Sequence, residues 1–136
     1  ARTREALMGH PGIAEVFARA QSLDMAVLSV GDLTPHSVFS EYGLLTREEI
    51  TSLEAAGAVG DLLCHFIDAE GNVIDHPVNK RVMAVDPLSL RGTRQIVLAS
   101  GGWHKLTVIR AALKMLRPTV LVVNEVVAER LAVESR

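Results

Sequence analysis

The stretch "SGGWHK", residues 100–105, combines residue types that bind anions. Gly101 and Gly102 would let the backbone approach a ligand closely, and a helix beginning just after them would offer unpaired N–H groups. His104 and Lys105 stand where a helix start normally prefers acids, and a phosphate bound among them would explain that choice. The spacing alone leaves a second interpretation open, in which these are ordinary loop glycines followed by a solvated lysine.

A second stretch, "GAVGDLL" at residues 57–63, places an acid directly after two closely spaced glycines. Gly57 and Gly60 could let the backbone approach a ligand, while the Asp61 carboxylate could accept hydrogen bonds from sugar hydroxyls. The structural alternative is a helix C-cap at Gly57, a turn at Gly60 and a capping role for Asp61. Taken alone, the stretch favours this alternative.

Polar residues also follow the apolar run "TVLVV" at residues 119–123. Asn124 and Glu125 would lie at the carboxyl end of a strand, which is where open α/β sheets bind their ligands. Either side chain could therefore reach a ligand. Asn124 is equally well explained as the N-cap of the last helix, and we favour that interpretation.

Several kinds of chemistry are not indicated. The five histidines show no metal-ligand spacing, so we expect no metal site. The glycine-rich stretches match neither a P-loop nor a dinucleotide fingerprint, no "GxSxG" elbow occurs, and no cofactor is expected. Cys64 lies in an apolar run, and we expect it to be packed on a strand rather than to act as a nucleophile.

Composition sets the broad class. The 136 residues are 49% hydrophobic, which is enough for one domain with a real core. The net charge of −2 and the aromatic content of 4% argue against nucleic-acid binding by this stretch. A lone cysteine fits a reducing cytoplasm, and we find no stretch as long as a membrane-spanning helix. The chain starts with "ARTREAL" rather than Met, and we therefore expect a fragment of a longer protein.

Hydrophobic periodicity and capping signals predict alternating helices and strands. The predicted helices cover residues 11–22, 47–56, 106–116 and 124–134, with a short helical turn at 86–93. The predicted strands cover residues 25–31, 61–68, 95–100 and 119–123, with a further extended piece at 76–85. The second helix is marked by a capping box, in which Thr46 precedes Glu49 by three residues.

The fold class that follows is α/β. The runs "QIVLA" and "TVLVV" are apolar throughout, which is typical of parallel strands covered on both faces. With the helix between them they form a βαβ unit. The section around the "AEG" turn at residues 69–71 is expected to form an antiparallel hairpin beside a mainly parallel sheet.

Taken together, "GAVGDLLCHFIDAEGNVI", "QIVLASGGWHKLTVIRAAL" and "VLVVNEVVAERL" resemble the sugar-binding domain of SorC-family bacterial transcriptional regulators. The upstream pieces "LSVGDL" and "YGLLTREEI" also fit, so the resemblance covers nearly the whole chain. It implies a fold like that of ribose-5-phosphate isomerase, binding of a phosphorylated sugar or polyol, and assembly into a dimer or tetramer. Such domains switch the DNA affinity of a separate N-terminal helix-turn-helix domain.

The resemblance also implies roles for single residues. Lys105 occupies the lysine of the family's "GGxxK" loop, which implies contact with the anionic part of the ligand, and Gly101 and Gly102 match its glycines. Asp61 matches the acid that follows "GAVG", which implies recognition of hydroxyls. The chain departs from the family where Asn124 replaces the first acid of "DExxA", so that a hydroxyl contact there is altered.

Residues 1–136 are therefore expected to form a single, partial effector-binding domain. The DNA-binding domain and the first strand and loop of the effector domain, where the family places other phosphate-binding groups, are expected to lie outside the chain. No turnover is expected. The alternatives are a sugar-phosphate isomerase, with Asp61 as base, Lys105 as anion anchor and Glu125 as a second acid–base group, and a purely structural assembly module.

Overall fold

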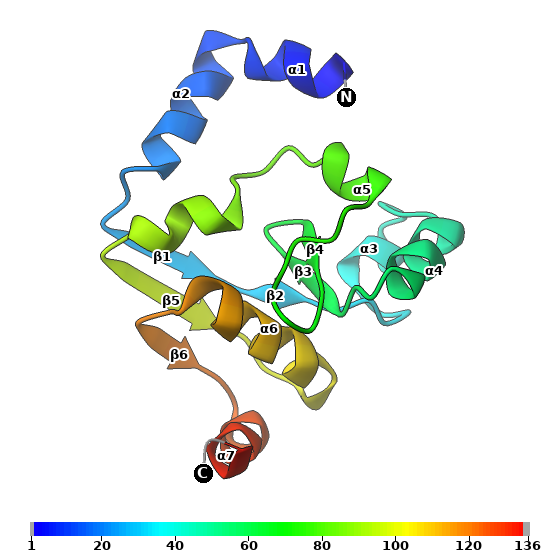
Figure 1. Ribbon diagram of the computed structural model, residues 1–136, viewed down its shortest axis with the longest axis vertical. Coiled ribbons are helices and arrows are strands. Elements are labelled where there is room, and N and C mark those ends of the chain that lie inside the picture. Colours follow the sequence, from blue (N-terminus) through cyan, green and yellow to red (C-terminus); the bar gives the residue numbers. More distant parts are fainter. Residues whose placement is uncertain (1, 135–136) are drawn as a thin grey trace.

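Two small sheets share one hydrophobic core in the computed structural model, which describes residues 2–134 (Figure 1). The strands are β1 (Met25–Leu28), β2 (Val30–Gly31), β3 (Gly60–Leu62), β4 (His65–Ile67), β5 (Gln95–Ala99) and β6 (Val120–Val122). The helices are α1 (Arg2–Met8), α2 (Pro11–Ala20), α3 (Val38–Glu41), α4 (Arg47–Ala55), α5 (Pro77–Lys80), α6 (Leu106–Leu116) and α7 (Glu125–Glu134). Two 3₁₀ helices complete the order, η1 (Pro87–Gly92) and η2 (Trp103–Lys105).

The first sheet has the order β1-β5-β6, and all of its strands are parallel. Strand β5, helix α6 and strand β6 form the predicted βαβ unit. Helix α6 is amphipathic and buries seven of its eleven residues, among them Ile109, Met115 and Leu116. Their contacts with Ile96 and Leu98 of β5 join helix and sheet in one cluster. The predicted α/β class with a mainly parallel sheet is thereby confirmed.

The prediction that these parallel strands are covered on both faces is wrong for the described residues. In β1, Ala26 is 5% exposed, whereas the next residue, Val27, points to the other face and is 65% exposed. Val120 and Val122 of β6 are also exposed. The β1-β5-β6 register places Val27, Val97 and Val120 side by side. This row of valines defines an uncovered sheet face, opposite the face that α6 covers.

The second sheet is antiparallel, in the order β2-β3-β4, and it corrects two predictions. Residues 61–68 are not one strand, because the chain reverses at Leu63 and Cys64, between paired Leu62 and His65. Both turn residues have positive φ, 51° and 62°, as a two-residue type I′ turn requires. The turn lacks Gly, Asn or Asp, so the sequence carries no signal for it. Cys64 is consequently exposed rather than packed on a strand.

The predicted strand 25–31 is divided between the two sheets. Residues 25–28 form β1, which pairs with β5, and residues 30–31 form β2, which pairs with β3. Only Ser29 separates them. The chain therefore passes from the parallel to the antiparallel sheet without a loop, and this crossing brings the two sheets together.

The helices are predicted better than the short strands. The capping box at Thr46 and Glu49 is present in both directions, and Gly57 follows α4 with φ of 89°. Residues 76–85 are not extended, because Pro77 begins α5 and His76 caps it by accepting from the Val78 N–H. Helices α1 and α3 were not predicted, and neither contains a buried residue.

Candidate functional site

A cleft of about 450 Å³ opens where the chain crosses from β1 to β2. It lies beyond the carboxyl end of β1 and beside the segment that follows β5, the expected location of a ligand site in an α/β sheet. Residues from three segments line it: Ser29, Val30, Gly31, Asp32, His36, Ser37, Val38, Phe39, Asp61, His104 and Lys105. We call it the Asp61 cleft. It contains three residues that the sequence singles out, Asp61, His104 and Lys105.

Asp61 is carried by β3 and is only 7% exposed. Its Oδ2 accepts a hydrogen bond from the Cys64 N–H at 2.8 Å, so the turn between β3 and β4 holds the carboxylate. Burial raises the pKa of Asp61, although the Cys64 N–H and the Lys105 ammonium act in the opposite direction. Asp61 faces Gly31 across the β2–β3 pair, and a Cβ at residue 31 would overlap the carboxylate. The glycine therefore makes room for the acid.

Lys105 extends away from the helix start in which it stands. Its Nζ donates to the backbone carbonyl of Val30 at 3.2 Å, which places the ammonium in the cleft with Asp61. This contact accounts for a cation at an unusual position, because the ammonium reaches back to β2 rather than remaining beside the positive end of α6. The arrangement sets one fixed positive charge beside a buried carboxylate.

The loop before Lys105 is shaped by Gly102, which has φ of 99°. The Gly102 N–H donates to Asn124 Oδ1 at 3.2 Å, and the His104 ring packs where a side chain at residue 102 would lie. No side chain caps the start of α6. The hydroxyl of Ser100 is buried without a hydrogen-bond partner among the described residues. The loop thus retains donors that an anion could use.

Other residues singled out by the sequence do not line the cleft. Asn124 is exposed, and its side chain holds the Gly102 N–H instead of capping its own helix, whose first bonds end on the Asn124 carbonyl. Glu125 is the exposed first residue of α7. Gly57 ends α4, and Gly60 lies where a Cβ would overlap the Gly31 carbonyl. A binding role for these residues stays a prediction.

Sequence reasoning did not select four polar residues of the lining: Ser29, Asp32, His36 and Ser37. Asp32 is 7% exposed, and its Oδ2 accepts from both the N–H and the hydroxyl of Thr34. Burial alone would raise the pKa of Asp32, but these hydrogen bonds and the charge of His104 bring it below the ordinary value. Asp32 could have been selected from the sequence, because it directly follows the end of a strand and the same rule had selected Asn124.

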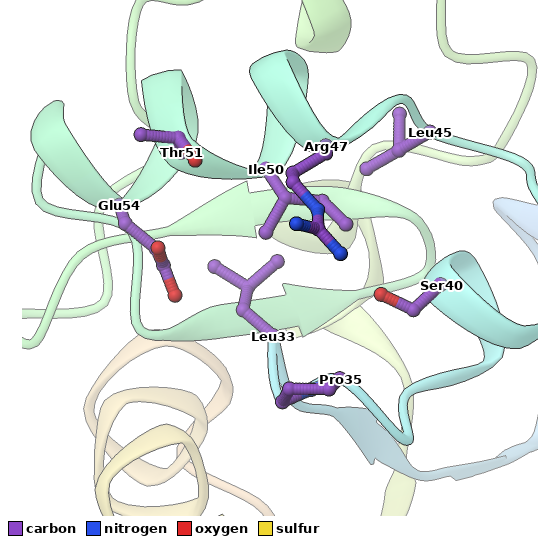
Figure 2. A pocket seen from close by; sticks show the side chains of 8 residues that line it. All are labelled: Leu33, Pro35, Ser40, Leu45, Arg47, Ile50, Thr51 and Glu54. Carbon is purple, nitrogen blue, oxygen red and sulfur yellow. The ribbon is translucent and has the colours of Figure 1, made fainter.

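A second cleft, also of about 450 Å³, is lined in part by residues of the segment 33–40 (Figure 2). Its lining comprises Leu33, Pro35, Ser40, Leu45, Arg47, Ile50, Thr51 and Glu54, and we call it the Arg47 cleft. Figure 2 shows the Arg47 guanidinium and the Glu54 carboxylate on opposite sides of Leu33. No residue that the sequence singled out lines this cleft. The segment of residues 33–40 contributes to both clefts, with Leu33, Pro35 and Ser40 lining the Arg47 cleft and residues 36–39 lining the Asp61 cleft.

Two further classes of site were searched for in the described part of the chain. Residues 2–134 contain no group of His, Cys, Asp and Glu side chains arranged to hold a metal ion. Within the same range, none of the helices combines the length and the apolar character needed to cross a membrane.

Comparison with known proteins identifies the class to which this chain belongs. Residues 1–132 match the family model described as "Putative sugar-binding domain", and the chain belongs to this family. Its relatives are transcriptional regulators of the SorC and DeoR type, which confirms the resemblance read from the sequence. Membership confirms the prediction of a regulatory binding domain and lends no support to the isomerase alternative.

Individual relatives are similar over nearly the whole chain. The erythritol catabolism regulatory protein of Brucella abortus is 28% identical over 131 residues, which cover 96% of this chain and 41% of the relative. The deoxyribonucleoside regulator of Bacillus subtilis is 28% identical over 88% of this chain and 38% of its own length. The chain therefore spans about two fifths of these curated relatives.

Solved structures of transcriptional regulators are similar to this chain as well. A DeoR family transcriptional regulator from Listeria monocytogenes has a TM-score of 0.88 at 26% identity, covering 94% of this chain and 52% of that one. The full-length sorbitol operon regulator of Klebsiella pneumoniae has a TM-score of 0.84 at 25% identity, covering 95% of this chain and 42% of that one.

Proposed function

We propose that this chain is part of the effector-binding domain of a bacterial transcriptional regulator, and that its effector is a phosphorylated sugar or polyol. One observation carries the proposal: Asp61 and Lys105, from segments far apart in the sequence, line the same cleft. A buried carboxylate accepts hydrogen bonds from hydroxyls, and a nearby ammonium attracts an anionic group. Sugar phosphates combine both features.

The effector's anionic end is assigned to Lys105 and the adjoining loop of Gly101 and Gly102. The Ser100 hydroxyl, which is buried without a hydrogen-bond partner among the described residues, supports this assignment, because it offers a donor to an anion. The hydroxyl-bearing carbons would then extend toward Asp61. An effector bound in this way acts by population shift, since it stabilises whichever arrangement of the domain it binds better.

The remaining parts of the proposal concern the whole regulator. DNA binding belongs to a separate helix-turn-helix domain, the regulator is a cytoplasmic dimer or tetramer, and the rest of the effector domain completes the pocket. The relatives support a longer protein, because this chain matches only 41% of the Brucella abortus regulator and 52% of the Listeria monocytogenes chain. The uncovered sheet face is a surface that further parts of the domain would cover.

The phosphate assignment is tested by replacing the cation. We expect Lys105→Ala to weaken a sugar phosphate about tenfold or more, because a charge-assisted hydrogen bond contributes roughly 1.5–3 kcal/mol. The same substitution should change the affinity for the dephosphorylated sugar much less. Calorimetric titration of wild type and variant with D-ribose 5-phosphate and D-ribose measures both effects.

Lys114→Ala is a matched control, because Lys114 lies on α6, which follows Lys105 directly, and its ammonium contacts Glu70 outside the cleft. Equal losses for the phosphorylated and free sugar in Lys105→Ala would contradict the phosphate assignment. A thermal-shift screen of phosphorylated and free sugars addresses the alternative of a structural module. A ligand at one hundred times its Kd adds about 2.7 kcal/mol of stability, so a screen with no shift would favour that alternative.

A further inference from the structure

Asp32 is a second buried carboxylate in the Asp61 cleft, and neither the sequence pattern nor the family assigns it a role. It is only 7% exposed and belongs to the lining. Both hydrogen bonds from Thr34 end on the same carboxylate oxygen, Oδ2. Asp32 is close enough to Asp61 for their charges to interact. A ligand between them would meet hydrogen-bond acceptors on two sides.

The charged residues of the cleft indicate which kind of ligand Asp32 favours. Two carboxylates, Asp32 and Asp61, face one lysine, Lys105, with His36 and His104 as the remaining titratable residues of the lining. Two buried acids would weaken the binding of phosphate alone in this cleft, because each repels an anion. A hydroxyl group is attracted instead of repelled, since it can donate a charge-assisted hydrogen bond to a carboxylate.

We propose that Asp32 determines specificity by accepting hydrogen bonds from effector hydroxyls while repelling anions that carry none. This inference rests on the proposed function, because it assumes that the effector binds in the Asp61 cleft. An effector with an anionic end and a chain of hydroxyls satisfies both acids and Lys105. Inorganic phosphate satisfies only the lysine and loses affinity through repulsion. Asp32 thus rejects abundant small anions that Lys105 alone would admit.

The test is a substitution with opposite effects on two probes. Asp32→Asn keeps the size of the side chain and an oxygen that can accept from Thr34, but it removes the charge. We expect it to weaken the sugar phosphate about tenfold or more and to strengthen inorganic phosphate about threefold. The sugar probe is whichever of D-erythrose 4-phosphate, D-ribose 5-phosphate and D-sorbitol 6-phosphate binds the wild type most tightly in calorimetry.

Thr34→Val provides the control for a merely structural role, because it removes a hydroxyl that bonds to Asp32 and leaves the acid in place. We expect this variant to keep the wild-type preference for sugar phosphate over inorganic phosphate. If Asp32→Asn weakens both probes, or changes neither, the specificity role is overturned while the proposed function stands. If the wild type binds none of the three sugar phosphates, the proposed function fails and this inference fails with it.

Discussion

At the scale of single residues, Gly31 shows how closely the cleft is packed. A methyl group at this position would overlap Oδ1 of Asp61, which is held from the other side by the Cys64 N–H. We expect Gly31→Ala to lower the free energy of unfolding by about 1–3 kcal/mol, the usual range for overpacking. It should also displace the carboxylate and weaken sugar-phosphate binding. Urea denaturation and calorimetry measure the two effects.

Gly92 offers the matched control. It has no neighbouring atom within 4 Å of an added Cβ, and its φ is not positive. Gly92→Ala should therefore leave both stability and binding unchanged or slightly improved. If Gly31→Ala behaved in the same way, the close approach of Gly31 to Asp61 would have no energetic importance.

The buried carboxylate of Asp61 should also give stability a characteristic pH dependence. Burial raises the pKa of Asp61 in the folded state above its ordinary value of 3.8, so the folded state binds the proton more tightly than the unfolded state. The contribution of Asp61 to stability is therefore fully present below pH 3.8, and it is lost as the pH rises through the folded-state pKa.

Asp61→Asn isolates this effect, because the other titrating groups are common to both proteins. Relative to the variant, the wild type should lose stability as the pH rises from the acid range toward neutrality. Denaturation curves recorded across that range measure the difference. A difference that stays constant, or that changes with the opposite sign, would show that burial does not control this carboxylate.

Local rules identified only part of the site from the sequence. Asp61 and Lys105 were selected because they match the "GAVGD" and "GGxxK" stretches of the family that the sequence resembles, whereas local spacing alone left both open to a structural interpretation. Asp32 follows a strand end and could have been selected by the rule that selected Asn124. His36 was missed because its place in the cleft comes from the β1-to-β2 crossing, which brings the strand end onto the antiparallel sheet. That crossing depends on long-range pairing, which no local spacing encodes. Asn124 illustrates the reverse case, since its side chain holds Gly102 rather than its own helix.

At the scale of elements, the turn between β3 and β4 is the most strained. Cys64 has φ of 62°, and a non-glycine residue in the left-handed region costs roughly 1–2 kcal/mol. We expect Cys64→Gly to stabilise the protein by about 1 kcal/mol, because glycine adopts this conformation without strain and retains the N–H that binds Asp61. Urea denaturation measures the gain.

Cys64→Ser is the control for this prediction, since it removes the thiol and retains the strain. It should leave stability close to that of the wild type. An equal gain in both variants would assign the effect to the thiol rather than to the backbone.

Elements with strong local signals were predicted, and those held by tertiary contacts were not. Helix α4 carries its capping box, and α6 carries a continuous apolar stripe that ends before Pro118. By contrast, α5 lies within residues 76–85, which were predicted to be extended. It is fixed by Asn79, whose side chain hydrogen-bonds the backbone of Phe66 and Ile74. Tertiary hydrogen bonds of this kind are not visible in a single sequence.

At the scale of the whole molecule, the uncovered sheet face has consequences for solubility. An apolar face on a parallel sheet promotes association, and Val27 and Val122 are 65% and 53% exposed there. We expect the isolated chain to self-associate as its concentration rises, and Val27→Lys to reduce that association. Sedimentation velocity at increasing concentration measures it.

Val38→Lys is the corresponding control, because Val38 is 60% exposed but lies on α3, away from the sheet. It should not change the association. A similar reduction in both variants would show that added charge, rather than the sheet face, governs solubility.

The segment of residues 33–40 has a thermodynamic consequence, because it contributes residues to the linings of two different clefts. A small molecule bound beside Arg47 would contact the same chain segment that carries His36 and Ser37 into the lining of the Asp61 cleft. Linkage then requires reciprocity: whatever factor the first molecule imposes on the affinity for the second, the second imposes on the first. Paired titrations performed in both orders must therefore give a single coupling constant, and its sign would reveal whether the Arg47 cleft favours or opposes an occupied neighbour.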